Sequence, residues 1–345
     1  GDTEDITNQT LKRSEIILKT IQLSNIALKL QGYYITNGHV KSEEEVIKAH
    51  TFARSVIPSM DLKGMTFFEK IYFYQANYWY SFILQNFERS IQMVNSSIEL
   101  FKAYPKMLIE DKDLYVKLLH QHMKISYQEG NLEALQKKMA YFDFFLKEHD
   151  NTFSPNSRLN AHLYFHFSKL NELLLSKQYL SGDQNIPQIA DFLKKNFHLI
   201  DAHKKMIFYY KFAGIKFLLN KADQAIPYLN KIINSKDPHL REDIQIFSRL
   251  MFLMAHYEMK NYDLLIYLIK SYKTFFSKTL GLDPLQQATF EFFKKAAFAN
   301  LEQKSIYLME LHKEVISLKS NHFLRRSFHY LDVEKWTSGL LKHSN

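Results

Sequence analysis

Apolar side chains recur at helical spacing along most of the chain, and the clearest example spans residues 243–278. The first half, residues 244–259, is apolar almost all round, which predicts a helix covered on both faces. The second half carries a single apolar stripe over residues 264–276, which predicts an amphipathic helix. Between them, Asn261 or Asp263 is expected to cap the second helix by accepting a backbone N–H. The stretch therefore predicts an antiparallel helix pair that leaves one face for a neighbouring pair.

The same two-helix pattern repeats along the chain. Inter-helix turns are expected near Gln85, Gly130, Leu175, Asn220, Lys260 and Asn300, at steps of 45 or 40 residues. A regular period in this range is typical of an α-solenoid. The predicted helix pairs lie near residues 11–57, 66–104, 113–147, 158–197, 202–235, 244–278 and 284–319, and a terminal capping helix near 322–341. Gly32 is expected to stop the first helix, and Pro187 to stand in the first turn of a helix that follows a loop.

Composition favours the same fold. Nine Gly and seven Pro among 345 residues are fewer than turn-rich β architectures need. The chain has no Cys, which excludes disulfides, thiolate metal sites and cysteine nucleophiles. No apolar run approaches the roughly 18 to 20 residues that a membrane helix requires. We therefore expect an all-α solenoid of about seven helix pairs, forming a single domain over residues 1–345.

Particular segments resemble known repeat families. The stretch KADQAIPYLNKIINSKDP, from Lys221, is similar to the second helix of the tetratricopeptide repeat, with Ala225, Leu229, Ile232 and Pro238 at the expected offsets. The segments HYEMKNYDLLIYLIKSYKTFFSK and RRSFHYLDVEKW resemble the C-terminal part of large, uncharacterised repeat proteins of Bacteroidota. The resemblance implies a TPR-like fold and brings no catalytic residues.

In a solenoid of this kind, the first helices of successive pairs line the concave face, where a partner peptide usually lies. Counting back from each turn places ten residues on that face, namely Tyr72, Gln75, Trp79, Lys117, His120, Lys124, Tyr127, Tyr210, Met254 and Tyr257. Lys117 and Lys124 are suited to hold an acidic side chain or a C-terminal carboxylate. For the apolar members the alternative is an ordinary place in the core.

Lysines are concentrated in one region. Residues 194–236 contain nine Lys against only Asp201 and Asp223, a net charge of +7. This region supports an alternative function, a regulatory or sensor module of a larger regulator that associates with nucleic acid. Against it, the lysines are too evenly scattered to form one helical stripe, as on an ordinary solvated surface.

Candidate catalytic chemistry is sparse. His162 and His166 lie four residues apart, a spacing that can bind a metal, but no Glu follows His162 and no third ligand is suggested nearby. Glycine-rich phosphate loops and nucleophile turns are also missing from the sequence. We therefore expect no metal, no cofactor and no enzymatic activity.

The favoured hypothesis is a non-catalytic scaffold that binds a peptide or protein segment on its concave face. Its partner is expected to be a protein, with nucleic acid as the alternative. Because the chain begins at Gly1 rather than Met, we expect a native N-terminal segment to have been removed, and a cytoplasmic location is favoured.

Overall fold

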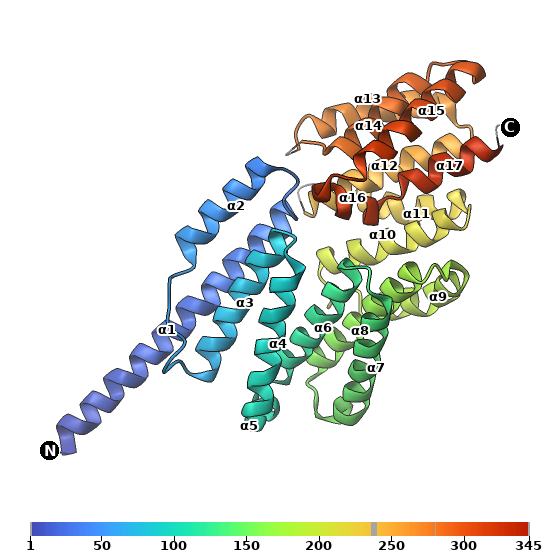
Figure 1. Ribbon diagram of the computed structural model, residues 1–345. Helices are drawn as coiled ribbons and strands as arrows, with labels where there is room; N and C mark the ends of the chain where they lie inside the picture. Colours follow the sequence, from blue (N-terminus) through green and yellow to red (C-terminus); the bar gives the residue numbers. More distant parts are fainter. Residues whose placement is uncertain (1, 236–239, 280, 344–345) are drawn as a thin grey trace. The chain divides into compact units, whose positions relative to one another are not determined.

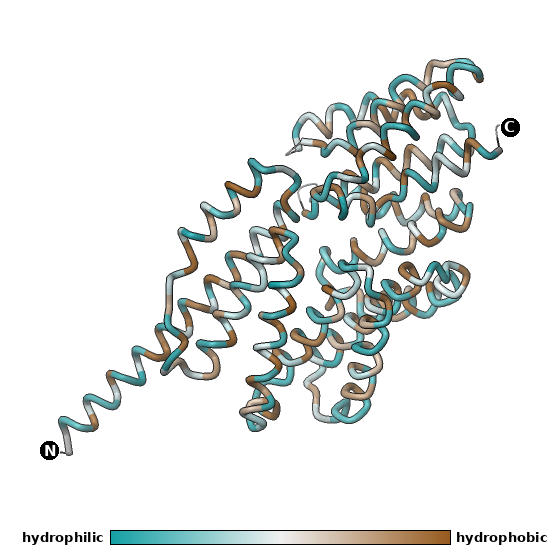
Figure 2. Tube along the Cα trace, viewed as in Figure 1, coloured by the Kyte–Doolittle hydropathy of each residue, from teal (hydrophilic) through white to brown (hydrophobic). Residues whose placement is uncertain are grey.

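The protein is all-α, as the sequence predicts. The computed structural model describes residues 2–235, 240–279 and 281–343, and these residues form helices and connecting turns without a strand (Figure 1). The chain divides into two compact units, Gly1–Ser176 (unit 1) and Lys177–Asn345 (unit 2). Figure 2 shows hydrophobic and hydrophilic residues alternating along most helices, the pattern of amphipathic helices that cover one another. Pro238, which the repeat resemblance uses, lies outside the described residues.

Unit 1 is a succession of helix pairs. Its helices are α1 (Asp2–Asn37), α2 (Glu43–Val56), α3 (Phe67–Ile83), α4 (Phe87–Ala103), α5 (Pro105–Glu110), α6 (Lys112–Gln128), α7 (Leu132–His149) and α8 (Pro155–Leu175), with the 3-10 turn η1 (Asp150–Thr152) before α8. Helix α1 packs on α3, α3 pairs with α4, α4 packs on α6, and α6 contacts both α7 and α8. Each pair therefore covers the next, as expected for stacked repeats.

Unit 2 continues the pattern. Its helices are α9 (Tyr179–Lys195), α10 (Ala202–Leu218), α11 (Ala222–Ile233), α12 (Glu242–Glu258), α13 (Tyr262–Phe276), α14 (Pro284–Ala296), α15 (Leu301–Leu318), α16 (Arg325–Tyr330) and α17 (Val333–His343), with η2 (His322–Leu324) before α16. Helix α12 contacts α10, α11, α13 and α14, and nearly all of its side chains are buried. This confirms the prediction that residues 244–259 form a helix covered on every side.

One turn geometry recurs between the helices of successive pairs. Gln85, Gly130, Asn220 and Lys260 all have positive φ angles, of 58°, 72°, 58° and 59°. In each case the next residue donates its backbone N–H to the carbonyl five residues earlier, as Asn131 does to Ser126 at 2.9 Å. This is the Schellman ending of a helix, in which a left-handed residue lets the chain reverse. Four of the six predicted turns therefore share this geometry. Near Leu175 the positive φ, of 59°, belongs to Lys177 instead, and Asn300 has a φ of −73° and caps α15.

Several predicted boundaries are wrong, each for a local reason. Helix α1 begins at Asp2 rather than near Leu11 and continues through Gly32, because Gly38, with φ of 76°, is the glycine that ends it. Its last turn closes through the Gly38 N–H and the carbonyl of Tyr34, 2.8 Å apart. Helix α9 starts at Tyr179, inside the expected loop. Pro187 consequently lies in the helix interior rather than in its first turn.

Two further features of unit 2 differ from expectation. Asn261 occupies the N-cap position of α13, but, contrary to the prediction, its side chain accepts no helix N–H; its amide instead lies 3.1 Å from His256 Nδ1. The predicted terminal helix is divided into η2, α16 and α17. It breaks because Asp332 accepts the N–H of Lys335 at 3.0 Å and so starts a new helix.

Gly130 and Gly32 provide a matched test of the turn. A Cβ added at either position would meet nothing within 4 Å, but only Gly130 has a positive φ. We expect Gly130→Ala to lower the free energy of unfolding by about 1–2 kcal/mol. Gly32→Ala should raise it by about 0.5–1 kcal/mol, because Ala is favoured inside a helix. Urea denaturation measures both, and an equal response of the two variants would contradict the turn assignment.

None of the described helices combines the length and the apolar composition that a bilayer crossing requires.

Candidate functional site

The predicted contact residues of α6 form one partly exposed stripe. Lys117, His120, Lys124 and Tyr127 follow one another at three or four residues and share one face of the helix. Each is partly exposed, whereas the intervening apolar residues, such as Leu118 and Leu119, are buried in the core of unit 1. We call these four residues the α6 stripe. It is the part of the sequence prediction that the structure brings together on a surface.

Three aromatic rings lie close to the ammonium group of Lys124. Its Nζ lies 4.2 Å from the centre of the Phe82 ring, 4.6 Å from that of Tyr34 and 5.2 Å from that of Trp79. Rings at this distance attract an ammonium group through their negative faces. Trp79 itself is only 7% exposed. The sequence predicts Trp79 as a contact residue on the surface. Its ring instead packs beside the Lys124 ammonium and is not available to a partner.

His120 and Lys117 are also constrained. The His120 ring is stacked on Tyr164 of α8, with centroids 4.1 Å apart and planes 6° apart. Burial lowers the pKa of the Lys117 ammonium, and the nearby carboxylate of Asp111 opposes that shift. Because these side chains are already held in place, they would lose less conformational entropy when a partner binds.

Helix α3 contributes less to the surface than predicted. Gln75 is 2% exposed and exchanges two hydrogen bonds of 2.9 Å with Gln121 of α6. This amide pair joins α3 to α6 across 46 residues of sequence. Tyr72 is partly exposed and stacks on Phe68. Gln75 and Trp79 occupy the same places before their turn as His120 and Lys124, but neighbouring helices cover them.

The three predicted contact residues of unit 2 are core residues. Met254 is fully buried, and Tyr210 donates its hydroxyl to the carbonyl of Tyr330 at 2.7 Å. Tyr257 packs edge-to-face against Phe292 and Trp336. Burial raises the pKa of Tyr257 to about 12. These side chains build unit 2 instead of lining a surface, because α12 is enclosed by its neighbours.

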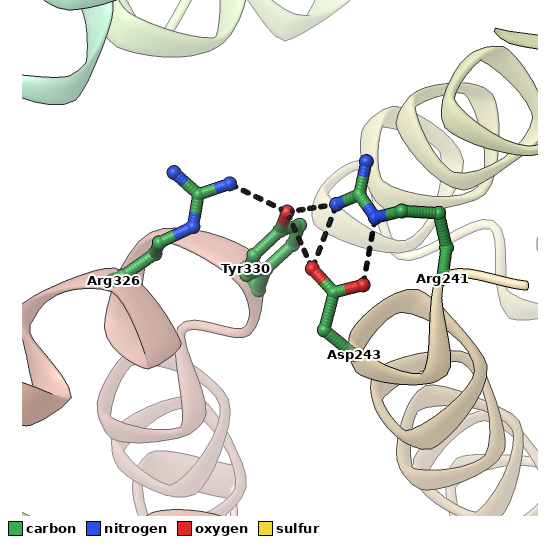
Figure 3. Close-up of polar contacts among 4 residues, drawn as sticks. All are labelled: Arg241, Asp243, Arg326 and Tyr330. Carbon is green, nitrogen blue, oxygen red and sulfur yellow. Dashed lines mark hydrogen bonds and ion pairs between the residues drawn. The ribbon is translucent and has the colours of Figure 1, made fainter. Parts of the chain in front are cut away.

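A partly buried polar cluster joins α12 to α16 in unit 2 (Figure 3). Arg241 donates from Nε and Nη2 to the two carboxylate oxygens of Asp243, at 2.8 and 2.7 Å. The Tyr330 hydroxyl accepts from Arg241 and Arg326, at 2.7 and 2.8 Å, and donates to Asp243 at 3.1 Å. We call these four residues the Arg241 cluster. The cluster is not predicted from the sequence, although Arg326 and Tyr330 belong to the segment RRSFHYLDVEKW that carries the repeat-protein resemblance.

The cluster has marked electrostatic consequences. Burial alone would raise the pKa of the Asp243 carboxyl, but the charge and hydrogen bonds of Arg241, with Arg326, hold that pKa well below its ordinary value. Burial, together with the charges of Arg326 and Arg241, lowers the pKa of Lys211 to about 7. Arg241 also has a φ of 53°, so its ion pair fixes a backbone conformation that non-glycine residues seldom adopt.

Most lysines of the basic region 194–236 are engaged locally. Lys195 pairs with Asp191 and Lys204 with Asp201, while Lys216 and Lys221 both pair with Asp183. Lys205 lies over the ring of Phe197, and Lys231 over those of Tyr209 and Tyr228. Lys236 lies outside the described residues. The lysines thus contact several different partners instead of forming one stripe.

The histidine pair of α8 is not part of a metal cluster in the described part of the chain, where no group of three or more potential ligands occurs. His162 lies 3.8 Å from Asp150. Burial, with a smaller effect of His162, lowers the pKa of His166 to about 4. Burial and the charge of Lys138 lower that of His122, on α6, to about 3.

These depressed histidine pKa values predict a pH dependence. In the unfolded chain these two histidines take up protons near pH 6.5, whereas in the folded protein they do so only at much lower pH. Their contribution to the free energy of unfolding is therefore fully present above about pH 6.5 and declines as the pH falls toward 4. We expect the variant His122→Gln/His166→Gln to lose less stability than the natural chain between pH 7 and 4. Thermal melting at each pH measures this, and identical pH profiles would contradict it.

Comparison with known proteins agrees on the fold. The chain is similar to a Rap protein whose crystal structure contains competence and sporulation factor, with a TM-score of 0.56. The match covers 96% of this chain and 97% of that chain, at 11% sequence identity. The fold is a TPR-like α-solenoid. No family model matches the chain and no curated protein matches its sequence, so the resemblance to Bacteroidota repeat proteins gains no support.

Proposed function

We propose that the protein is a non-catalytic interaction scaffold that binds a segment of a partner protein along the α6 stripe. The observation that carries this proposal is the stripe itself: four polar or aromatic side chains, Lys117, His120, Lys124 and Tyr127, reach the surface on one face of one helix. A row of side chains on a helix face suits an extended segment better than it suits a small molecule, which usually occupies a closed pocket.

The two lysines define the chemistry of that segment. Lys117 and Lys124 are seven residues apart, so their positions on the helix differ by about 10.5 Å along its axis. An extended peptide covers about the same distance in three residues. The proposed ligand therefore carries two carboxylates three residues apart, the second of which can be the C-terminal carboxylate.

The ring contacts support this assignment energetically. Because Phe82, Tyr34 and Trp79 already position the Lys124 ammonium, an incoming carboxylate meets a charge that is held in place. Tyr127 and the stacked pair of His120 and Tyr164 add flat apolar area beside the charges. The Rap protein of similar fold was crystallised with competence and sporulation factor, which is consistent with a partner-binding role for the fold.

Charge reversal on the stripe tests the proposal. Peptides with a free C-terminus are selected from a random library against the natural chain, and their affinities are measured by fluorescence anisotropy. We expect Lys117→Glu/Lys124→Glu to weaken binding at least tenfold, about 1.4 kcal/mol. The control Lys106→Glu/Lys137→Glu changes the net charge equally at exposed positions of α5 and α7, and should change binding less than twofold.

Circular dichroism establishes that both double variants remain folded. The milder pair Lys117→Gln/Lys124→Gln replaces the first variant if charge reversal unfolds unit 1. Equal loss of affinity in the stripe and control variants, or no loss in either, would place the binding surface elsewhere.

A further inference from the structure

The N-terminal helix presents a second face that unit 1 does not cover. The C-terminal half of α1 packs against α3 through Leu23, Ala27 and Leu30, which are all buried. The N-terminal half extends beyond α2 and α3 (Figure 1). Because α1 is a continuous helix from Asp2 to Asn37, both halves share one axis and their faces can be compared directly.

Large aliphatic side chains gather on the uncovered face. They are Ile6, Leu11, Ile17, Leu18, Ile21 and Leu28, with exposed fractions from 51% to 64%. At about 100° per residue they occupy an arc of roughly 140°, the width of a face that normally packs against another helix. This arc is separate from the one that carries Leu23, Ala27 and Leu30.

The spacing of these side chains is symmetric about Ile17. Ile6 lies eleven residues before Ile17, and Leu28 lies eleven residues after it. Eleven residues are about three helical turns, with a drift of only about 20°, so the three side chains lie nearly in line. In an antiparallel pair of identical helices, each residue before the two-fold axis meets the residue equally far beyond it. Ile17 would then meet itself, and Ile6 would meet Leu28.

The charges at the edge of this face agree with the same arrangement. Glu4 and Lys29 are exposed on the same side of the apolar arc, thirteen residues before and twelve after Ile17. An antiparallel pair brings Glu4 of each copy close to Lys29 of the other. In a parallel pair these two edges would lie on opposite sides of the interface, with Glu4 and Lys29 at opposite ends, so only the antiparallel arrangement brings the two charges together.

We infer that a second copy of this chain binds to the exposed face of α1, so that two α1 helices pair antiparallel around Ile17. The six aliphatic side chains of each copy, at roughly 100 Å² apiece, supply an interface on the order of 1,000 Å², the size that a stable association requires. The dimer uses α1, whereas the α6 stripe remains available for a partner segment.

Single cysteines test the geometry, since the chain has no Cys of its own. In Ile17→Cys the two thiols meet at the two-fold axis, so mild oxidation should yield a disulfide-linked dimer of the full chain. Ile6→Cys should stay monomeric on a non-reducing gel, whereas a mixture of Ile6→Cys and Leu28→Cys should form the cross-linked pair. Equal cross-linking of Ile17→Cys and Ile6→Cys alone would indicate a parallel pair and overturn the inference.

Light scattering tests the association itself. The natural chain should be dimeric at micromolar concentration, and Ile17→Asp should be monomeric with an unchanged melting temperature, because Ile17 is exposed in unit 1. Glu4→Lys should weaken the dimer at low salt, and adding Lys29→Glu should restore it. A natural chain that is monomeric at every concentration would overturn the inference, as would a dimer that Ile17→Asp leaves intact.

Discussion

Replacing Asp243 with Asn should lower the free energy of unfolding by about 3–5 kcal/mol, the largest effect expected of any substitution considered for this protein. The change preserves the size of the side chain but removes the only carboxylate of the Arg241 cluster. Arg241, whose side chain is 4% exposed, would then lose its ion pair with Asp243. Breaking a buried ion pair by removing one partner costs far more than a surface ion pair contributes. Urea denaturation of Asp243→Asn and of the natural chain measures this loss of unfolding free energy.

Asp263→Asn is the matched control, because Asp263 is exposed in the first turn of α13. It should cost less than about 1 kcal/mol, the usual value of a carboxylate at a helix N-terminus. The two variants should also differ in pH dependence. Since the pKa of Asp243 is lowered in the folded protein, its stabilisation is present above the unfolded pKa of about 3.9 and is lost as pH falls further. Comparable losses in the two variants at pH 7 would contradict the cluster.

Replacing Gln75 with Leu should destabilise the protein by about 1–3 kcal/mol, because the amide of Gln121 would lose both of its hydrogen bonds inside the core of unit 1. Gln121→Leu should have a similar effect. The double variant Gln75→Leu/Gln121→Leu should be less destabilised than either single variant, since it leaves no buried amide alone.

The double-mutant cycle therefore predicts a favourable coupling between α3 and α6. Its value also tests the packing of α3 on α6, since the pair joins residues 46 apart in the sequence. Additive effects of the two single substitutions would show that these side chains do not meet.

Much of the fold follows from the sequence because its signals are local. The all-round apolar pattern of residues 244–259 predicts an enclosed helix, and α12 is one. The turns at Gln85, Gly130, Asn220 and Lys260 were predictable because each interrupts helical periodicity in the same way. Glycine alone misleads: Gly32 is tolerated within α1, and Gly182 lies inside α9, where an added Cβ would come within 3.2 Å of Ile215. It permits close helix packing there instead of making a turn.

The candidate site was less predictable because it depends on register between helices. On α6, counting from the turn identified the four residues of the stripe. On α3 the same count selected Gln75 and Trp79, which are buried, because Gln75 bonds Gln121 of α6 and Trp79 packs on Tyr34 of α1. The Arg241 cluster was out of reach for a related reason. Arg241 and Tyr330 are 89 residues apart in the sequence, and no local pattern indicates that they meet in space.

The most direct measurement of the central claim is site-specific photo-cross-linking between the protein and a selected peptide. p-Benzoylphenylalanine replaces Tyr127 on the α6 stripe in one variant and Tyr141, an exposed tyrosine of α7, in the other. We expect the peptide to cross-link to the variant at position 127 and not to the one at position 141. Cross-linking at position 141 without cross-linking at position 127 would contradict the assignment of the α6 stripe as the partner-binding surface.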